Sequence, residues 1–394
     1  MGENRSLSNG QEGNVPKLRF PGFEGEWENT ELGNLAIYGK DKTRVTKNHF
    51  VSTENIEQNF GGIVPFEDSK TMVDGTEFTK GDILIANIRP YLKKIWQSDM
   101  DGACNADVLV LKPQEIDNVF FYFLVAQNKF IDYVMGGVKG SKMPRGDKAH
   151  ILQYNTAVPS ILEQQQIAKF LSLLSNRIAT QKELVETLKK YKRGLLDKIF
   201  PPKKDSLFPT VRLSKMADFL QGLTYSPIDI ANSGYLVLRS SNIQNAALSF
   251  DDCVYVNMEI PTHLQVKQGD IIMCVRNGSK KLVGKSAKIP CEMPMTTWGA
   301  FMMIIRSKID CSYIYQYLNS QAFYSQVFKD TGTATINQIT KGILNECELP
   351  LPPKNERDRI ATLLDGFDKR IESTYFSLLK MQDLRKSLLQ QLFI

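Results

Sequence analysis

Apolar residues recur at alternating steps of four and three along two long segments, residues 160–200 and 353–393. This spacing averages 3.5 residues per turn, so it predicts two long helices that each present an apolar seam, as in a coiled coil. The predicted seam residues are Ile167, Leu171, Leu174, Ile178, Leu188 and Leu195 in the first segment, and Ile360, Leu364, Phe367, Ile371, Met381 and Leu388 in the second.

The two segments repeat each other at a constant offset of 193 residues. Glu163 recurs as Glu356, and the alignment continues without a gap to the end of both segments. Interruptions of the apolar seam also match, with a cation at the eighth seam position of each copy, Lys192 and Arg385. Matched interruptions favour helices that pair with each other, with the polar positions helping to set the register.

The ends of both helices carry recognisable signals. Ser160 and Glu163 have the spacing of a capping box, and the prolines at 201–202 stop the first helix. The second helix follows Pro352-Pro353, where Asn355 is the predicted cap. Taken alone, this pattern equally fits a plain helical hairpin or a dimerisation zipper.

The rest of the chain forms two regions that resemble each other more weakly. Gly81-Asp82 precedes an apolar run at 83–85, and Gly269-Asp270 precedes one at 271–273, which predicts a turn into a buried strand in both regions. Both regions are therefore predicted to be mixed α+β domains. Further predicted strands lie at 108–111, 237–238 and 301–305, and predicted helices at 118–133 and 312–327.

A basic loop follows each Gly-Asp strand, and a second polar stretch follows later in each half, at 139–145 and at 331–338. Cations mixed with Ser, Asn and Gly suit contact with phosphates, and Arg and Asn can also read base edges. For most single lysines, a solvated surface loop remains the simpler interpretation. The candidate DNA-binding residues are Arg89, Tyr91, Lys93, Lys94, Lys142, Arg145, Asn242, Arg276, Asn277, Ser279, Lys280, Lys281 and Lys285.

Composition limits the possible classes of protein. The 394 residues, 42% of them hydrophobic, suffice for two or three domains, and a net charge of +6 permits a polyanionic partner without requiring one. The first 14 residues are polar and are expected to form a flexible leader, and the longest apolar run, 119–126, is too short to span a bilayer. We therefore expect a cytoplasmic protein without membrane contact. The six cysteines show no C-x-x-C pair, so reduced thiols and no metal site are expected.

Motifs of common enzymes do not occur in the sequence. The segment from Gly278 to Ser286 superficially resembles a phosphate-binding loop, but it has one residue too many before Gly284-Lys285-Ser286. The sequence contains neither G-x-G-x-x-G nor H-E-x-x-H, and it lacks the Asn/Asp-Pro-Pro-aromatic tetrapeptide of adenine methyltransferases. We therefore predict no catalytic residues in this chain.

The order of region, helix, region and helix, together with two motifs, resembles the DNA-specificity subunit of type I restriction–modification systems over nearly the whole chain. One motif is the early Leu18-Arg19-Phe20-Pro21 with Trp27. The other is a proline-rich approach to each helix followed by Glu-Gln-x-x-Ile, which Glu163-Gln164 and Ile167 match. The second copy departs from it, because Arg357 replaces the glutamine.

The resemblance implies an α+β fold with two target-recognition domains, residues 15–155 and 206–347, after a leader at 1–14. Helical spacer regions, 156–205 and 348–394, would separate and join the domains and pair as an antiparallel coiled coil. Each domain would recognise one half of a bipartite double-stranded DNA sequence. The helices would set the number of unread base pairs between the two halves and would dock two methyltransferase subunits.

Those methyltransferase subunits would bring S-adenosylmethionine and methylate a flipped adenine, while this chain would hold no cofactor. Translocase–nuclease subunits would complete the restriction complex. Two other classes stay open at this point. One is a coiled-coil scaffold that binds proteins rather than DNA. Salt-dependent binding of a DNA duplex would distinguish the DNA-recognition subunit from this scaffold. The other is a self-sufficient enzyme, against which the missing motifs argue.

Overall fold

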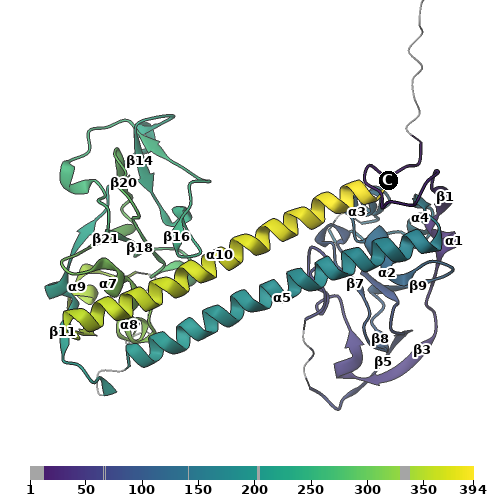
Figure 1. Ribbon diagram of the computed structural model, residues 1–394, viewed down its shortest axis with the longest axis horizontal. Coiled ribbons are helices and arrows are strands. Elements are labelled where there is room, and N and C mark those ends of the chain that lie inside the picture. Colours follow the sequence, from purple (N-terminus) through teal and green to yellow (C-terminus); the bar gives the residue numbers. More distant parts are fainter. Residues whose placement is uncertain (1–12, 65, 67, 141, 202–204, 329–337) are drawn as a thin grey trace, which may run out of the picture. The chain divides into compact units, whose positions relative to one another are not determined.

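The computed structural model describes residues 13–64, 66, 68–140, 142–201, 205–328 and 338–394 (Figure 1). The chain divides into two compact units. Unit 1 comprises Met1–Lys182 and Ser377–Ile394, and unit 2 comprises Glu183–Phe376. The predicted leader, apart from residues 13 and 14, and positions 331–337 lie outside the described residues.

The two predicted helices are α5, Ile161–Ile199, and α10, Lys354–Leu392. Each unit contains a segment of both. In unit 1, Leu171 near the start of α5 shares a core with Leu392 at the end of α10. In unit 2, Leu196 near the end of α5 shares a core with Leu364 near the start of α10. Within each unit the two helices therefore run antiparallel, which confirms the predicted fold class.

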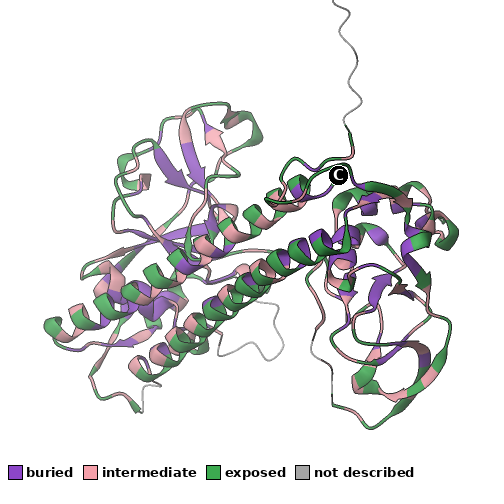
Figure 2. Cartoon of the chain, turned by 45° about the vertical axis from the view of Figure 1, so that its right-hand side comes forward, coloured by how far each residue is buried: buried purple, intermediate pink, exposed green. Residues whose placement is uncertain are grey.

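Burial along both helices follows the predicted seam. Ile167, Leu171 and Ile178 are buried on α5, whereas most positions between the seam residues are exposed (Figure 2). Lys192, the predicted seam cation of α5, has a partner on α10: its Nζ lies 2.5 Å from Asp368 Oδ1. A charged pair on an apolar seam disfavours other registers, since a shifted register would bury both charges without partners.

Two details of the helix ends differ from the prediction. Helix α10 begins at Lys354, so Asn355 lies within its first turn and is not the cap. Glu163 does not serve a capping box, because both of its carboxylate oxygens accept hydrogen bonds from the Arg19 guanidinium, at 2.9 and 2.8 Å. The N-terminal segment thus uses the residue that the pattern assigned to the helix end.

Unit 1 contains one sheet with strand order β2-β9-β6-β7 and another with the order β3-β5-β8-β4. A short antiparallel pair, β1 with β10, joins the two ends of this region next to α5. The elements are β1 Glu28–Glu31, α1 Leu32–Leu35, β2 Ala36–Tyr38, β3 Lys42–Thr46, β4 Phe50–Val51, β5 Met72–Phe78, β6 Ile83–Ala86, the 3-10 helix η2 Pro90–Leu92, β7 Ile95–Gln97, β8 Gly102–Cys104, β9 Val108–Pro113, α2 Asn118–Val125, α3 Asn128–Gly136, α4 Lys148–Leu152 and β10 Asn155–Val158.

Unit 2 repeats this plan, with sheets ordered β12-β21-β18-β19 and β13-β17-β14-β20, and with β11 pairing β22. The elements are β11 Thr210–Arg212, α6 Leu213–Met216, β12 Ala217–Gln221, β13 Ile230–Ala231, β14 Tyr235–Leu238, β15 Ile243–Gln244, β16 Ala247–Leu248, β17 Tyr255–Val256, β18 Ile271–Cys274, the 3-10 helix η7 Lys280–Leu282, β19 Ser286–Lys288, β20 Thr296–Trp298, β21 Met302–Ser307, α7 Cys311–Leu318, α8 Gln321–Val327, α9 Lys341–Glu346 and β22 Glu348–Pro350.

The predicted Gly-Asp turn is confirmed in both units. Gly81 and Gly269 have φ of 98° and 84°, a region that glycine adopts without strain. The following aspartates close the turn, because Asp82 accepts a hydrogen bond from the Thr79 amide and Asp270 accepts one from Lys267, each at 2.8 Å. Strands β6 and β18 follow directly and are completely buried.

Each predicted aromatic helix is split into two. The segment at 118–133 forms α2 and α3, and the segment at 312–327 forms α7 and α8. The second break is explained by Ser320, whose hydroxyl accepts a hydrogen bond from the Phe323 amide and caps α8. Among the residues that the structure describes, no helix is long and apolar enough to cross a membrane.

Candidate nucleic-acid interface

The first basic loop of unit 1 runs from Arg89 to Lys94 between β6 and β7 and is tightly held. Arg89 and Lys93 flank η2 with φ of 52° and 56°, a left-handed conformation that costs about 1–3 kcal/mol for such residues. Backbone hydrogen bonds maintain it, because the Arg89 amide donates to Pro144 O at 2.8 Å and the Asn59 amide donates to Leu92 O at 3.0 Å. The loop therefore presents its cations from a fixed backbone.

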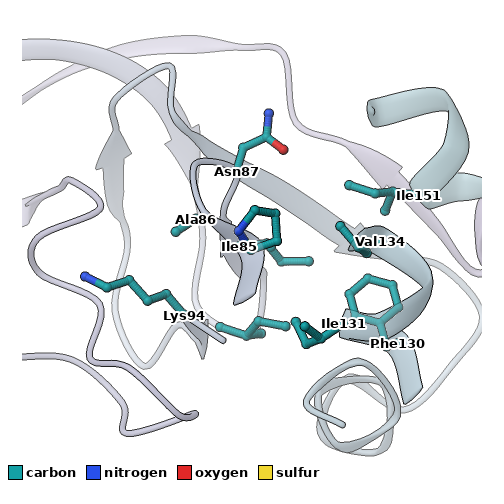
Figure 3. A pocket seen from close by; sticks show the side chains of 10 residues that line it. Ile85, Ala86, Asn87, Lys94, Phe130, Ile131, Val134 and Ile151 are labelled. Atoms are coloured by element: carbon teal, nitrogen blue, oxygen red, sulfur yellow. The ribbon is translucent and has the colours of Figure 1, made fainter. Parts of the chain in front are cut away.

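The base of this loop rests on the hydrophobic core. A cavity of about 10 Å³ is lined by Pro90 of the loop, by Ile85 of β6 and by Ile131 and Val134 of α3. Figure 3 shows this site. That volume lies at the lower limit for one water molecule, so the loop is packed against α3 with almost no free space.

The second basic stretch of unit 1 meets the first one. Arg145 forms β-bridges with Ile88 and with Lys139. Asp147 then caps α4 by accepting hydrogen bonds from the amides of Ala149 and His150, and its carboxylate also contacts Lys139 Nζ. The bond with Lys139 and then these amides lower the pKa of Asp147 to about 2. Two stretches that are far apart in the sequence thus form one exposed basic edge.

Unit 2 has the same arrangement. Arg276 follows β18 and forms a β-bridge with Gln338, and the Ile339 amide donates to Val275 O at 2.7 Å. The loop then continues through η7. Asn277 is held at its start, because its amide donates to Ser240 Oγ at 3.3 Å and accepts a hydrogen bond from the Ser279 backbone at 3.0 Å.

Three segments meet at equivalent places in the two units, and we call each meeting point the arginine junction. In unit 1 it comprises Ile88, Asp107 before β9, and Arg145; in unit 2 it comprises Arg276, Phe301 before β21, and Gln338. The Asn87 amide donates to Asp107 O, and the Val275 and Arg276 amides donate to Phe301 O, so the backbone pairing corresponds. One guanidinium is held at each junction. Arg145 Nη2 lies 3.0 Å from Asp107 Oδ1, and the Arg276 guanidinium lies 5.3 Å from the centre of the Phe301 ring.

The family model described as "Type I restriction modification DNA specificity domain" matches residues 24–190 and 265–378, which is more than half of the chain. The chain belongs to this family. The chain is also 23% identical to the specificity subunit of the type I restriction enzyme MjaVIII from Methanocaldococcus jannaschii, over 389 residues covering 88% of this chain and 87% of that one. It is 29% identical to the EcoKI specificity subunit of Escherichia coli K12 over 171 residues, covering 41% and 36% of the two chains.

Solved structures share the fold of this specificity subunit. The S subunit of a type I restriction–modification system from M. genitalium aligns with a TM-score of 0.61 at 15% identity, covering 96% of this chain and 99% of that one. A chain from a type I restriction–modification complex aligns with a TM-score of 0.57 at 18% identity, covering 93% and 97%. These two likenesses extend over both units, as the sequence repeat predicts.

The remaining candidate residues of the specificity subunit differ in their exposure and in their side-chain contacts. Lys142, Lys280 and Lys281 are exposed, and Tyr91 retains 48% of its surface. Lys280 Nζ lies 5.7 Å from the centre of the Phe328 ring, and Lys93 and Lys285 are half-buried. Lys94 Nζ donates to Thr53 O at 2.6 Å, which ties this lysine to its own domain.

Asn242 does not belong to the interface, contrary to the prediction. Its side chain is completely buried. The amide donates to the carbonyls of Ser249 and Asp252 at 3.0 Å, and its oxygen accepts a hydrogen bond from the Arg239 backbone at 2.9 Å. The repeated Ser-x-x-Asn segment therefore shapes a turn. Similarly Asn55, at the matching place in unit 1, accepts a hydrogen bond from the Ser52 amide at 2.8 Å.

The glutamine of the family motif also has a structural explanation. Gln164 donates to Pro159 O at 2.9 Å and accepts a hydrogen bond from the Asp117 amide at 3.0 Å, which links α5 to the start of α2. In the second copy, the Arg357 guanidinium donates to Pro352 O at 2.8 Å. Arginine thus reproduces the first bond, and as a pure donor it cannot reproduce the second.

Asp107, Phe301 and Gln338 are junction residues that were not predicted as site residues. Asp107 is acidic and Phe301 is apolar, so a search for cations passes over both. Their signal is positional: Asp107 lies immediately before β9 and Phe301 immediately before β21, the strands that pair with β6 and β18.

Proposed function

We propose that this specificity subunit reads a bipartite DNA sequence, with each target-recognition domain binding one half. The observation that carries the proposal is the repeated arginine junction, where the segment after β6 or β18 meets a second segment, at Arg145 in unit 1 and at Gln338 in unit 2, beside equivalent strands. Lysines around each junction suit phosphate contact, which positions a protein on the duplex, and the arginines suit the base edges. Neutralised phosphates would release counterions, so affinity should fall steeply as salt is raised.

In this proposal the antiparallel helices set the number of base pairs between the two half-sites and dock two adenine methyltransferase subunits. Both helices are 39 residues long, which supports a spacer of defined length. The methyltransferase subunits would supply S-adenosylmethionine chemistry, and translocase–nuclease subunits would supply DNA movement and cleavage. This chain itself would contribute binding and geometry, without a catalytic group.

Single-molecule sequencing of genomic DNA tests the proposal. Cells would express this chain together with its cognate methyltransferase subunit. We expect methyladenine confined to one split motif, and its absence when this chain is omitted. An unmodified genome, in cells where the complex assembles and the methyltransferase is competent, would contradict the proposal and favour a scaffold that binds only proteins.

A further inference from the structure

We propose that Arg145 and Arg276 are the specificity-determining residues of the two domains, and that each reads a guanine in its own half-site. This inference rests on the proposed function and assigns a base to the two residues. It arises from the arginine junctions, where a guanidinium occupies an equivalent place in both units but comes from different segments of the chain.

The first argument is that both arginines are held in place, whereas the neighbouring lysines are not suited to read bases. An arginine side chain loses rotamer freedom when it binds, so fixing it beforehand lowers that cost. Asp107 fixes Arg145 through a charge-assisted contact at 3.0 Å, and Phe301 fixes Arg276 through its ring face at 5.3 Å. Lysine is a compact point charge, which suits a phosphate better than a patterned base edge.

The second argument is that both guanidinium groups keep donors free. The Arg145 side chain is 56% exposed, although one terminal nitrogen faces Asp107. A ring face such as that of Phe301 contacts the guanidinium without occupying its in-plane N–H groups. A guanidinium with free parallel donors matches the O6 and N7 acceptors of guanine in the major groove, a pattern that no other base presents there.

The third argument is the exchange between the two junctions. At the first bridge position unit 1 has Ile88 where unit 2 has Arg276, and at the second unit 1 has Arg145 where unit 2 has Gln338. Opposed residues of an antiparallel bridge point to the same side. Each domain therefore presents one arginine on the same side of its junction. The two bridged segments run antiparallel, and the arginine comes from the first segment in unit 2 and from the second in unit 1. The two half-sites therefore need not place guanine at equivalent positions.

The test is to determine the methylation motif of the complex with Arg145→Ala, Arg145→Lys, Arg276→Ala and Arg276→Lys. DNA libraries with each position of the wild-type motif randomised would serve as the substrate. We expect each variant to lose guanine preference at one base pair of one half-site, by roughly 5- to 150-fold in relative methylation rate. The other half-site and the spacer should stay unchanged, and the retained half-site reports a folded and assembled complex.

Matched controls are Arg44→Ala in unit 1 and Arg212→Ala in unit 2, both exposed arginines in surface ion pairs, with Asp74 and Glu346 respectively. Neither should alter the motif.

Asp107→Ala separates base reading from phosphate contact. If Arg145 reads a base, losing its carboxylate partner relaxes the same base pair. If Arg145 contacts a phosphate, removing the negative charge strengthens binding to all sequences.

Two outcomes would overturn the inference in different ways. Arginine variants that lower methylation evenly across all sequences, with the motif intact, would place these residues on phosphates and leave the proposed function standing. A wild-type complex that methylates no bipartite motif would overturn the proposed function, and the assignment of the arginines with it.

Discussion

At the scale of single residues, the two helix copies differ at their shared glutamate. Glu163 has 1% of its side-chain surface exposed and binds Arg19 with both oxygens, whereas Glu356 is 44% exposed and lies 3.9 Å from Arg359. We predict that Glu163→Gln lowers the free energy of unfolding by about 2–3 kcal/mol, since it leaves a largely buried guanidinium without a counter-charge. Urea denaturation measures this change.

Glu356→Gln is the matched control, because it makes the same substitution at the equivalent position of the other helix. An exposed ion pair contributes about 0–1 kcal/mol, so this variant should unfold almost as the wild type does. Equal losses in the two variants would show that the Arg19 contact is not what stabilises the first copy.

Asn242 gives a second prediction at this scale. Asn242→Ala removes three hydrogen bonds made by a completely buried side chain, and we expect a loss of about 2–3 kcal/mol in stability, because buried polar groups are left unsatisfied. Thermal unfolding measures it. Asn277→Ala, at a partly exposed site where water can replace the lost partners, should cost about 1 kcal/mol or less. A larger loss from Asn277 than from Asn242 would reverse our assignment of structural and interface roles.

Residue type alone could not separate these roles. Asn242 and Asn277 both lie in polar segments, and only tertiary contacts show that one amide is buried and the other reaches the surface. The basic loops were predicted because cations follow a recognisable turn in both halves. The residues that hold the arginines were missed, because their role depends on three segments that meet only in the folded domain.

At the scale of elements, unit 2 joins α7 to α10 through a polar network built on two aspartates of α10. Asp365 accepts hydrogen bonds from Lys288 at 2.7 Å, Ser312 at 2.7 Å and Gln316 at 2.9 Å. The buried Gln316 also donates to Asp368 at 2.8 Å. The offset of 193 places serines, at 172 and 175, where α10 has these two aspartates, so α5 lacks the carboxylates on which the network depends.

This network predicts a pH dependence of unit 2. Burial raises the pKa of Asp365, but the hydrogen bonds from Lys288, Ser312 and Gln316 outweigh it, and the net pKa is lowered. A lowered pKa in the folded state adds stability that is complete above the unfolded value of about 3.9 and is lost as the pH falls through the folded value. We therefore expect wild-type stability to fall below about pH 4 more steeply than that of Asp365→Asn.

Urea denaturation at pH 7 and at several acidic pH values measures both effects. At pH 7, Asp365→Asn should cost about 1.5–3 kcal/mol, since it replaces a charged acceptor. Glu372→Gln, at an exposed position of α10, is the control and should keep the wild-type pH profile. An Asp365→Asn profile parallel to that of the wild type would exclude Asp365 as the source of the acid sensitivity.

Elements were predicted well where local pattern decides and less well where tertiary contacts decide. The heptad repeat and the Gly-Asp turns are local, and both are confirmed. The break of each aromatic helix was missed because aromatic residues continue on both sides of it and the capping Ser320 is itself buried. The role of Glu163 was missed because its partner, Arg19, is distant in sequence and the local capping-box spacing was complete.

At the scale of the whole molecule, the repeat predicts that spacer length and half-site identity can be changed separately. Deleting residues 182–188 from α5 and 375–381 from α10 removes one matched heptad from each helix and preserves the seam, since the pattern repeats every seven residues. Seven residues correspond to about 10 Å of helix, so the spacer should shorten by up to about three base pairs. Sequencing of methylated DNA from cells with the cognate methyltransferase measures the new motif.

The half-sites should keep their sequences, because both arginine junctions and the loops around them are untouched by these deletions. Deleting the heptad from α5 alone is the control: it displaces the seam of one helix by a full repeat relative to the other, which separates matched positions such as Lys192 and Asp368. That variant should lose the motif. An unchanged spacer in the double deletion, or altered half-sites with an intact complex, would mean that the helices do not determine the distance between the half-sites.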